Sequence, residues 1–222
     1  MPAESPLRDR HAAGIGLIET MRWEPHAGFL RLDRHLYRLS ASAAALGLPF
    51  DLGTVRGLLD GVGGSEPLRV RLLVGADGEP TLTTHAFVPV PDGTVWRVAI
   101  ARTRLSSGDE LLRHKTTRRA VYEAARAEFG AAEADEVILL NERGEVCEGT
   151  ITSVFVDPGD GGPLRTPALE CGLLAGVLRG EMIATGEARE AVLTEGDLRC
   201  ARAIVVGNSL RGLIDARLES GV

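Results

Sequence analysis

Short strand patterns joined by turn-like segments recur along this chain, and only a few amphipathic helical patterns interrupt them. Residues 14–32 alternate apolar and polar positions on both sides of the turn-like run EPHAG, which predicts a hairpin. Asp33 then stands where a helix N-cap is expected, before an amphipathic stretch that stops at Gly47. Further elements are expected as a helix near 51–60 and strands near 68–75, 81–90 and 94–103. This half of the chain is therefore predicted to be α+β.

The second half repeats the mixture of strands and helices. Residues 111–130 predict a helix, with Lys115 in a short extended or irregular segment at its start. Later elements are expected as a hairpin from strands at 136–141 and 150–156, a loop-to-helix entry within 171–186, and a strand and turn over 203–215. We expect the chain to divide near 103–110, into domains 1–104 and 105–222.

Composition narrows the class of protein. No apolar run among the 222 residues approaches the roughly 18–20 needed to cross a bilayer, so no membrane span is expected. A net charge of −6 argues against a general nucleic-acid binder. The three cysteines form no CxxC pair, the histidines show no metal-ligand spacing, and the N-terminus shows no apolar leader. We therefore expect a cytoplasmic protein without disulfides or a metal site.

The basic residues are strongly skewed. Of the 25 lysines and arginines, 24 are arginine, and the one lysine is Lys115. A coding bias toward arginine would replace surface lysines at almost no cost, because an exposed cation needs only its charge. Arginine cannot replace a lysine that must lose its proton and attack a carbonyl group. Lys115 is therefore a candidate for Schiff-base chemistry.

Several runs carry a more specific pattern: EGTITSVF at 148–155, LRT at 164–166, LAGVLR at 174–179, HKTTRRAVYEAA around Lys115, RLDRHLYRL at 31–39 and NSLRG at 208–212. Together they resemble the class IV aminotransferases, the fold-type-IV family that uses pyridoxal 5′-phosphate (PLP). One position departs from the family pattern, which has Asn where this chain has Ser153. The resemblance implies a small α/β N-terminal domain, a larger β-rich pseudo-barrel domain, PLP in the cleft between them, and a homodimer.

The resemblance also implies roles for individual residues toward the cofactor. Lys115 matches the Schiff-base and catalytic lysine, and Glu148 matches the carboxylate that holds the protonated pyridine nitrogen. Arg38 matches the phosphate-binding arginine, whose planar fork suits bidentate contacts. An exposed cap lysine, a solvated turn glutamate and a polar-face helix arginine are the ordinary alternatives for these three positions.

Backbone amides are expected to complete the phosphate site. The run GVLR at 176–179 opens a helix, so the amides of Val177 and Leu178 would point at an anion. Ser209 and Leu210 resemble a second phosphate-contacting segment. Relatives often carry threonines where this chain has Leu178 and Leu210, so only the backbone amides remain as donors at those two positions.

Substrate contacts are expected from a different set. Arg71 lies mid-strand among apolar neighbours, where a bare charge is costly to bury unless a substrate carboxylate partners it. The alternative is a strand-edge arginine that faces water. Glu19 and Thr20 match family positions on the substrate side of the cofactor. Further candidates, which the sequence does not order, are Arg104, Arg113, Arg118 and Arg211; His114 beside the lysine is expected to be structural.

Two enzyme functions follow from the resemblance. The first is 4-amino-4-deoxychorismate lyase, which forms 4-aminobenzoate and pyruvate for folate synthesis; the NSLRG run and the short chain favour it. The second is a transaminase that passes the amine of a branched-chain, D-amino-acid or other primary-amine donor to a 2-keto acid. A PLP-binding protein without turnover is a third possibility, against which Lys115, Glu148 and Arg38 argue.

Overall fold

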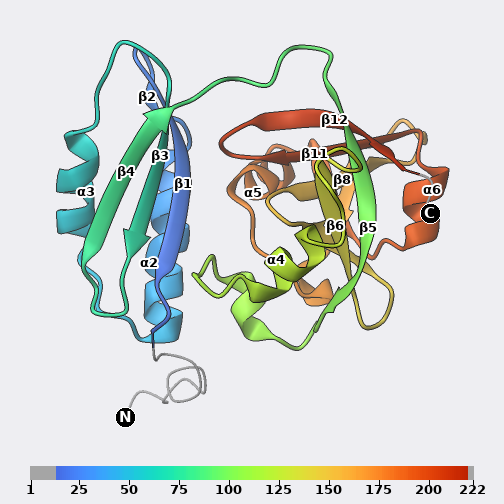
Figure 1. The fold of residues 1–222 in the computed structure, drawn as a ribbon, viewed down its shortest axis with the longest axis horizontal. Helices are drawn as coiled ribbons and strands as arrows, with labels where there is room; N and C mark the ends of the chain where they lie inside the picture. The colour runs from blue at the N-terminus through green and yellow to red at the C-terminus, as the bar shows by residue number, and fades with distance from the viewer. Residues whose placement is uncertain (1–13, 220–222) are drawn as a thin grey trace. The chain divides into compact units, whose positions relative to one another are not determined.

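The computed structural model describes residues 14–219, which fall into two compact units (Figure 1). The first unit holds the described residues up to Val88 together with His114–Arg118; the second holds Pro89–Arg113 and the residues from Arg119 onward. This grouping differs from the expected division near residue 104, because the strand that begins at Val95 pairs within the second unit. The assignment of 1–104 and 105–222 as functional domains stays a prediction.

The first unit is a four-stranded antiparallel sheet with two helices. Its strands are β1 (Leu17–Glu24), β2 (Gly28–Phe29), β3 (Leu68–Val74) and β4 (Pro80–Ala86), and its helices are α2 (Leu32–Leu46) and α3 (Leu52–Asp60). The strand order is β2-β1-β3-β4, so β3 is an internal strand. The predicted hairpin is confirmed as β1 and β2, which pair through Trp23 and Phe29.

The predicted stop at Gly47 is confirmed, but the strand expected near 81–90 ends at Ala86 and the predicted helix cap at Asp33 is wrong. Helix α2 stops at Gly47, whose φ of 65° is the left-handed conformation that glycine adopts readily. Asp51 caps α3 by accepting hydrogen bonds from the Gly53 and Thr54 amides. Asp33 is not the cap of α2: Arg31 occupies that position, and Asp33 lies in the first turn. Its negative charge there still favours the positive end of the helix.

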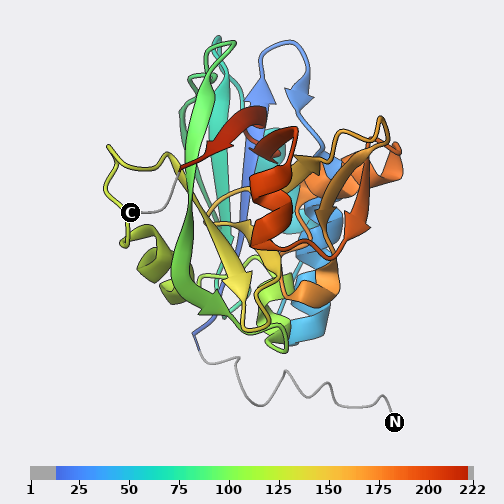
Figure 2. The same ribbon diagram turned by 90° about the vertical axis from the view of Figure 1, so that its right-hand side faces the viewer.

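The second unit is built on an eight-stranded sheet that curls around its own core (Figure 2). Its strands are β5 (Val95–Leu105), β6 (Glu136–Asn141), β7 (Val146–Gly149), β8 (Ser153–Asp157), β9 (Leu164–Pro167), β10 (Ala188–Ala191), β11 (Ala203–Asn208) and β12 (Gly212–Leu218). They follow the order β10-β9-β8-β11-β12-β5-β6-β7. The helices are α4 (Ala120–Arg126), α5 (Val177–Ala184) and α6 (Glu195–Cys200), with 3₁₀ turns at Glu110–Arg113 and Leu169–Cys171. The fold is the α+β architecture with a curled, β-rich second part that the sequence predicts.

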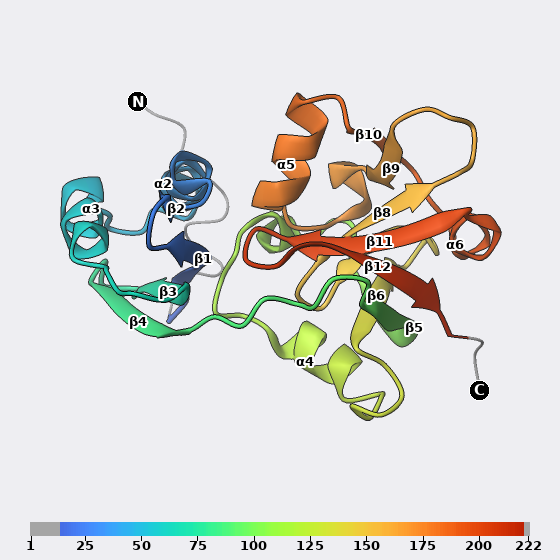
Figure 3. The same ribbon diagram turned by 90° about the horizontal axis from the view of Figure 1, so that it is seen from above.

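Helix α2 and helix α3 both lie on one face of the four-stranded sheet, as the view from above shows (Figure 3). Side chains on that face of β1 and β3 are buried, among them Met21, Val70 and Leu72. Residues between them, such as Thr20 and Arg71, point to the opposite face because side chains alternate along a strand. The sheet therefore has one face covered by the helices of this unit and one face that they do not cover, called the open face below.

The helix predicted over 111–130 is much shorter than expected. Helix α4 spans only Ala120–Arg126, and the segment before it pairs with the start of β1 instead of coiling. The Ile18 amide donates to the Lys115 carbonyl (2.8 Å) and the Thr117 amide to the Gly16 carbonyl (2.9 Å). Lys115 thus lies in a short extended segment, as predicted, because strand pairing satisfies its backbone there.

Candidate active site

The predicted site residues belong to both units, and the geometry of each half is fixed within its own unit. The first unit carries Glu19, Thr20, Arg38, Arg71 and Lys115. The second carries Glu148, Val177, Leu178, Ser209 and Leu210.

Lys115 extends the edge of the four-stranded sheet. Leu17 and Thr116 form an antiparallel bridge, so Lys115 stands opposite Ile18. Its neighbour His114 turns the other way, toward the helices, where its Nδ1 lies 3.0 Å from Ser42 Oγ of α2. Strand alternation therefore places the Lys115 side chain on the open face of the sheet. His114 has the structural role that the sequence suggests.

Arg71 lies on the same open face as Lys115. Its Cα is the cross-strand partner of Thr20 in β1 and of Thr83 in β4. The side chain is half-buried and β3 is an internal strand, so Arg71 does not lie at a strand edge. Among residues 14–219, the Arg71 side chain has no hydrogen-bond or ion-pair partner. A half-buried guanidinium without a partner favours an anionic ligand beside it.

Glu19 lies on the helix-covered face and takes part in a buried charge network. Its carboxylate accepts from Arg38 Nε (2.8 Å) and Nη2 (2.6 Å), and His35 Nδ1 lies 2.6 Å from the same carboxylate. Glu19 and His35 are each only 1% exposed. The structure does not favour the predicted substrate contact for Glu19, because burial and this bidentate pair assign its oxygens to holding Arg38 in place.

The network makes the stability of the protein depend on pH. Burial alone would raise the pKa of the Glu19 carboxyl, but the charge of Arg38 and hydrogen bonds from His35 and Arg38 lower it to about 2 from the ordinary 4.5. A lowered pKa in the folded state stabilises the fold above the unfolded pKa, and this stability is lost as pH falls through the folded pKa. The difference corresponds to about 3 kcal/mol.

We expect the free energy of unfolding to fall as pH decreases from about 4.5 to about 2, and Glu19→Gln to remove about 3 kcal/mol of that fall. Urea unfolding at a series of pH values measures it. The control is Asp33→Asn, because the Asp33 side chain is 94% exposed and should contribute little. An undiminished pH dependence in Glu19→Gln would contradict the assignment.

In the second unit, Glu148 lies on β7 with its carboxylate buried and held from two sides. Tyr122 Oη donates to Glu148 Oε1 (2.7 Å), and the Leu174 amide donates to the same oxygen (3.1 Å). Burial, the charge of Glu148 and this hydrogen bond all raise the pKa of Tyr122, so the phenol remains a donor. Glu148 is therefore not a solvated turn residue.

Tyr122→Phe is expected to lower kcat by about tenfold, because Glu148 loses a donor that fixes its direction. The loss of one buried hydrogen bond should also cost about 1 kcal/mol of stability. Steady-state kinetics and thermal unfolding measure both effects. Tyr37→Phe is the matched control, since that hydroxyl belongs to a side chain that is 78% exposed. Unchanged kcat in Tyr122→Phe would contradict this role.

The predicted phosphate segments meet at one end of the curled sheet. Helix α5 begins at Val177 after Gly176, as the run GVLR predicts. A Cβ at Gly176 would lie 2.6 Å from Ser153 Oγ, and one at Gly207 would lie 3.1 Å from Leu178 Cδ2. Ser153, the start of α5 and the end of β11 are therefore in close contact, and the first amides of α5 have no intrahelical acceptor.

The turn between β11 and β12 differs from the expectation at Leu210. Its amide donates to Asn208 Oδ1 (3.1 Å), and the Arg211 amide donates to the same oxygen (2.9 Å). The predicted phosphate contact at Leu210 is not favoured, because the Asn208 side chain already accepts that hydrogen. Val177 and Leu178, at the start of a helix, keep the geometry of an anion site.

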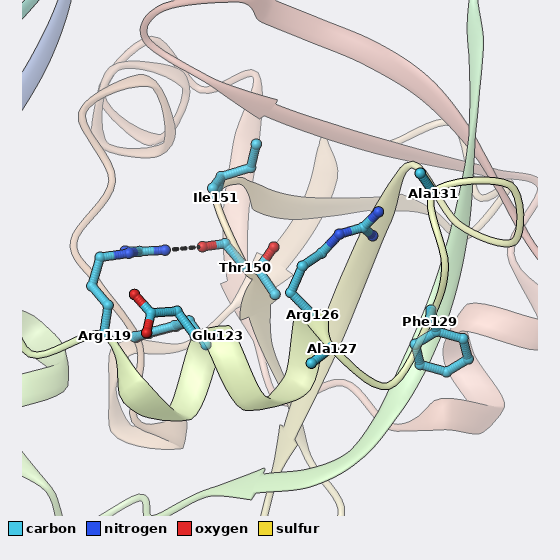
Figure 4. Close-up of a pocket in the computed structure, with 9 residues that line it drawn as sticks. Arg119, Glu123, Arg126, Ala127, Phe129, Ala131, Thr150 and Ile151 are labelled. Carbon is cyan, nitrogen blue, oxygen red and sulfur yellow. Dashed lines mark hydrogen bonds between the residues drawn. The ribbon is translucent and has the colours of Figure 1, made fainter.

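A cavity of about 460 Å³ opens in the second unit between α4 and the turn after β7 (Figure 4). Arg119 reaches across it and donates to the Thr150 carbonyl (2.7 Å). The guanidinium of Arg119 also stacks on the Tyr122 ring, which lines the cavity and hydrogen-bonds to Glu148. None of the predicted site residues lines this cavity, so it lies beside the Glu148 half of the site and does not contain it.

The four arginine candidates that the sequence does not rank differ in their surroundings. Arg104 donates to the carbonyls of Ala101 and Arg102 on its own strand, and Arg211 lies over the Trp96 ring (5.9 Å). Both guanidinium groups are therefore engaged by neighbours within the second unit. The side chains of Arg113 and Arg118 are exposed.

Tyr122 and His35 were not identified from the sequence as residues of the site. Tyr122 was part of a helical pattern, and His35 was one of several scattered histidines. The signal that could have identified Tyr122 is that it follows Lys115 within the same predicted helix. Their roles depend on contacts with residues 26 and 16 positions away.

Over residues 14–219, no helix is both long and apolar enough to span a membrane. Within the same range, no three His, Cys, Asp or Glu side chains gather in a way that could hold a metal ion.

The chain is similar to several known proteins. The family "Amino-transferase class IV" matches residues 16–218. A crystal structure of a "Putative amino-acid aminotransferase" from Mesorhizobium loti is 51% identical and covers 92% of this chain and 100% of its own, with a TM-score of 0.86. A "Putative aminodeoxychorismate lyase" of Schizosaccharomyces pombe is 27% identical over 81% of this chain and 80% of its own. A "Probable branched-chain-amino-acid aminotransferase" of Thermotoga maritima is 30% identical over 81% of this chain and 66% of its own.

Proposed function

Because the chain belongs to the class IV aminotransferase family, an enzyme family, we propose that it is a PLP-dependent enzyme acting on an amine that bears a carboxylate. The observation that carries the proposal is the buried Glu148 carboxylate, which Tyr122 and the Leu174 amide hold from two sides. Such a carboxylate suits a protonated pyridine nitrogen, because that partner supplies both a proton and a positive charge.

The remaining donors also fit this cofactor. Its dianionic phosphate needs a cation and amides, and we assign these roles to Arg38 of the first unit and to the start of α5 in the second. Its aldehyde needs a lysine, and Lys115 is the only lysine in the chain. The buried Glu19 partner keeps the Arg38 fork oriented before any ligand binds.

PLP, when bound, supplies a carbonyl carbon for covalent attachment and a ring that stores an electron pair. The chain supplies the proton transfers. Lys115 would hold the cofactor through its Nζ and, as a free amine, would remove the substrate proton. Glu148 would hold the ring nitrogen in its protonated form, and Arg71 on the open face would bind the substrate carboxylate beside Thr20.

For the reaction itself we propose the lyase: expulsion of pyruvate from 4-amino-4-deoxychorismate, leaving 4-aminobenzoate for folate synthesis. The similarity to a protein named aminodeoxychorismate lyase, over 81% of this chain, supports it. The NSLRG run at 208–212, which shapes the turn beside α5, supports it as well.

Transamination is the second candidate, and a specific observation favours it. The 51% identical structure is named as an amino-acid aminotransferase, and one 30% identical relative is named for branched-chain amino acids. In that reaction Lys115 would also return the proton, and a 2-keto acid would accept the amine. The donor would be a branched-chain, D-amino-acid or other primary amine.

The deciding experiment supplies the purified protein with PLP and compares substrates with and without a 2-keto acid. Pyruvate and 4-aminobenzoate released from 4-amino-4-deoxychorismate without keto acid support the lyase. Activity that strictly requires added keto acid replaces the lyase with the transaminase. A protein that stays colourless and binds no PLP overturns the whole proposal, and one that binds PLP but turns over neither substrate class is the PLP-binding protein without catalysis.

Arg71→Gln is expected to raise KM for the substrate by about 30-fold and to leave kcat within about threefold. The reason is that a lost charge pair of about 2 kcal/mol affects the bound substrate and the transition state equally. The control Arg56→Gln removes an equal charge from α3, on the covered side of the sheet. A change confined to kcat would argue against carboxylate binding by Arg71.

The family resemblance also supports a homodimer, and we propose that the protein is located in the cytoplasm. Sedimentation of the purified protein tests the assembly, since a dimer of 23.6 kDa chains is well separated from a monomer. Fractionation of intact cells tests the location.

A further inference from the structure

A fully buried carboxylate anchors the turn between β7 and β8. Glu136, the first residue of β6, is 0% exposed. Its Oε1 accepts hydrogen bonds from the Val137 amide (2.8 Å) and from the amide and hydroxyl of Thr150 (3.0 and 2.5 Å). Its Oε2 accepts from the Ile151 amide (3.1 Å) and from Thr152 Oγ1 (2.8 Å). One side chain thus receives five hydrogen bonds, four of them from this turn.

Two other side chains hold the carbonyl groups of the same turn. Arg119 Nη2 donates to the Thr150 carbonyl (2.7 Å), and Asn208 Nδ2 donates to the Ile151 carbonyl (3.1 Å). The Asn208 Oδ1 atom in turn accepts the amides of Leu210 and Arg211. The turn after β7 is therefore connected to helix α4 on one side and to the β11–β12 turn on the other.

Glu136 also packs directly against the residue that follows Glu148. A Cβ at Gly149 would lie 2.8 Å from Glu136 Oε2 and 2.4 Å from Thr152 Oγ1. The carboxylate therefore fills the space beside the end of β7, which leaves the turn no room to shift toward β6. Buried charges add little net stability compared with well-packed apolar side chains. Its value to the protein is the fixed position of the turn.

We propose that Glu136 is a positioning residue for the cofactor site: it fixes the turn after Glu148 and so the direction of the Glu148 carboxylate. Asn208, which donates to the Ile151 carbonyl, connects the same turn to the β11–β12 turn. This inference rests on the proposed function, because the group that Glu148 is positioned to meet is the PLP ring nitrogen. Glu136 itself need not touch the cofactor.

Glu136→Gln tests the proposal, because the amide group turns an NH₂ toward backbone amides that can only donate. We expect the PLP dissociation constant to rise by about tenfold or more and kcat to fall by a similar factor, while KM for the amine stays within about twofold. In the PLP-free protein, hydrogen exchange of the 149–152 amides should accelerate. A loss of stability in Glu136→Gln together with unchanged PLP affinity and unchanged exchange of these amides would overturn the inference.

Two threonines provide a matched pair if Glu136→Gln fails to fold. Thr152→Val removes one buried hydroxyl that donates to Glu136 (2.8 Å), and Thr166→Val removes one that donates to the Val154 carbonyl (2.9 Å). Both changes conserve shape and delete a single buried bond in the same unit. Weaker PLP binding in Thr152→Val alone supports the inference, and equal effects in both variants overturn it.

The experiments distinguish a failure of the positioning role of Glu136 from a failure of the proposed function. If the unmodified protein binds no PLP, the proposed function fails, and the exchange of the 149–152 amides still decides whether Glu136 holds the turn. If the unmodified protein binds PLP and Glu136→Gln binds it equally well, the positioning role fails and the proposed function stands.

Discussion

Lys115→Ala is expected to lower kcat by about 10⁴-fold or more, because a nucleophile that also carries the proton has no substitute in this chain. The other basic residues are arginines, which stay protonated and cannot attack a carbonyl. The yellow colour that PLP gives when joined to a lysine should disappear as well. Kinetics with saturating PLP and the visible absorbance spectrum measure both effects.

The informative control at this position is Lys115→Arg. It keeps the positive charge and the long side chain but not the removable proton, so it should be as inactive as Lys115→Ala. Borohydride reduction of the PLP-loaded protein, followed by peptide mapping, should place the label on the peptide with Lys115. Substantial activity in Lys115→Arg would show that the residue acts only through its charge.

Glu148→Gln is expected to lower kcat by about 10³-fold with KM changed by less than about threefold. Glutamine keeps the shape and can still accept from Tyr122, but a neutral amide cannot stabilise a protonated ring nitrogen. Glu148→Asp keeps the charge but shortens the side chain by one methylene, so its kcat should lie between those of the unmodified protein and Glu148→Gln. Steady-state kinetics at saturating PLP measure the series.

Glu145→Gln is the control for the loss of one negative charge near β7. Glu145 accepts hydrogen bonds from Arg143 and Asn141 in the β6–β7 turn, and these bonds lower its pKa to about 2. Removing that charge should cost stability and leave kcat nearly unchanged. A similar loss of kcat in Glu145→Gln and Glu148→Gln would mean that the overall field, and not a contact of Glu148, is responsible.

Much of the fold followed from local patterns. The β1–β2 hairpin, the Gly47 stop and the helix near 51–60 depend on a few neighbouring residues, so the sequence could predict them. The helix expected over 111–130 was overestimated, because pairing of Lys115 with β1 involves residues nearly a hundred positions away. Propensity carries no information about such a distant partner.

The candidate site, like the fold, could be predicted from the sequence only in part. Residue type singles out Lys115, the only lysine, because a Schiff base demands that side chain. The family resemblance adds Glu148 as the partner of the pyridine nitrogen. Spacing does not reveal that Glu19 pairs with Arg38, or that Asn208 takes the Leu210 amide. Those contacts depend on which distant segments pack together.

The sequence by itself determined the chemical groups available to this protein: one lysine, a glutamate in the EGT run, an arginine in the helix after the first hairpin, and a helix that opens with glycine. The tertiary structure decided which of these groups are oriented and by what. Burial turns Glu19 and Glu136 into anchors for Arg38 and for the turn after Glu148. The physical reason is that a carboxylate's role depends on the donors around it, and strand register and helix packing bring those donors from distant parts of the chain.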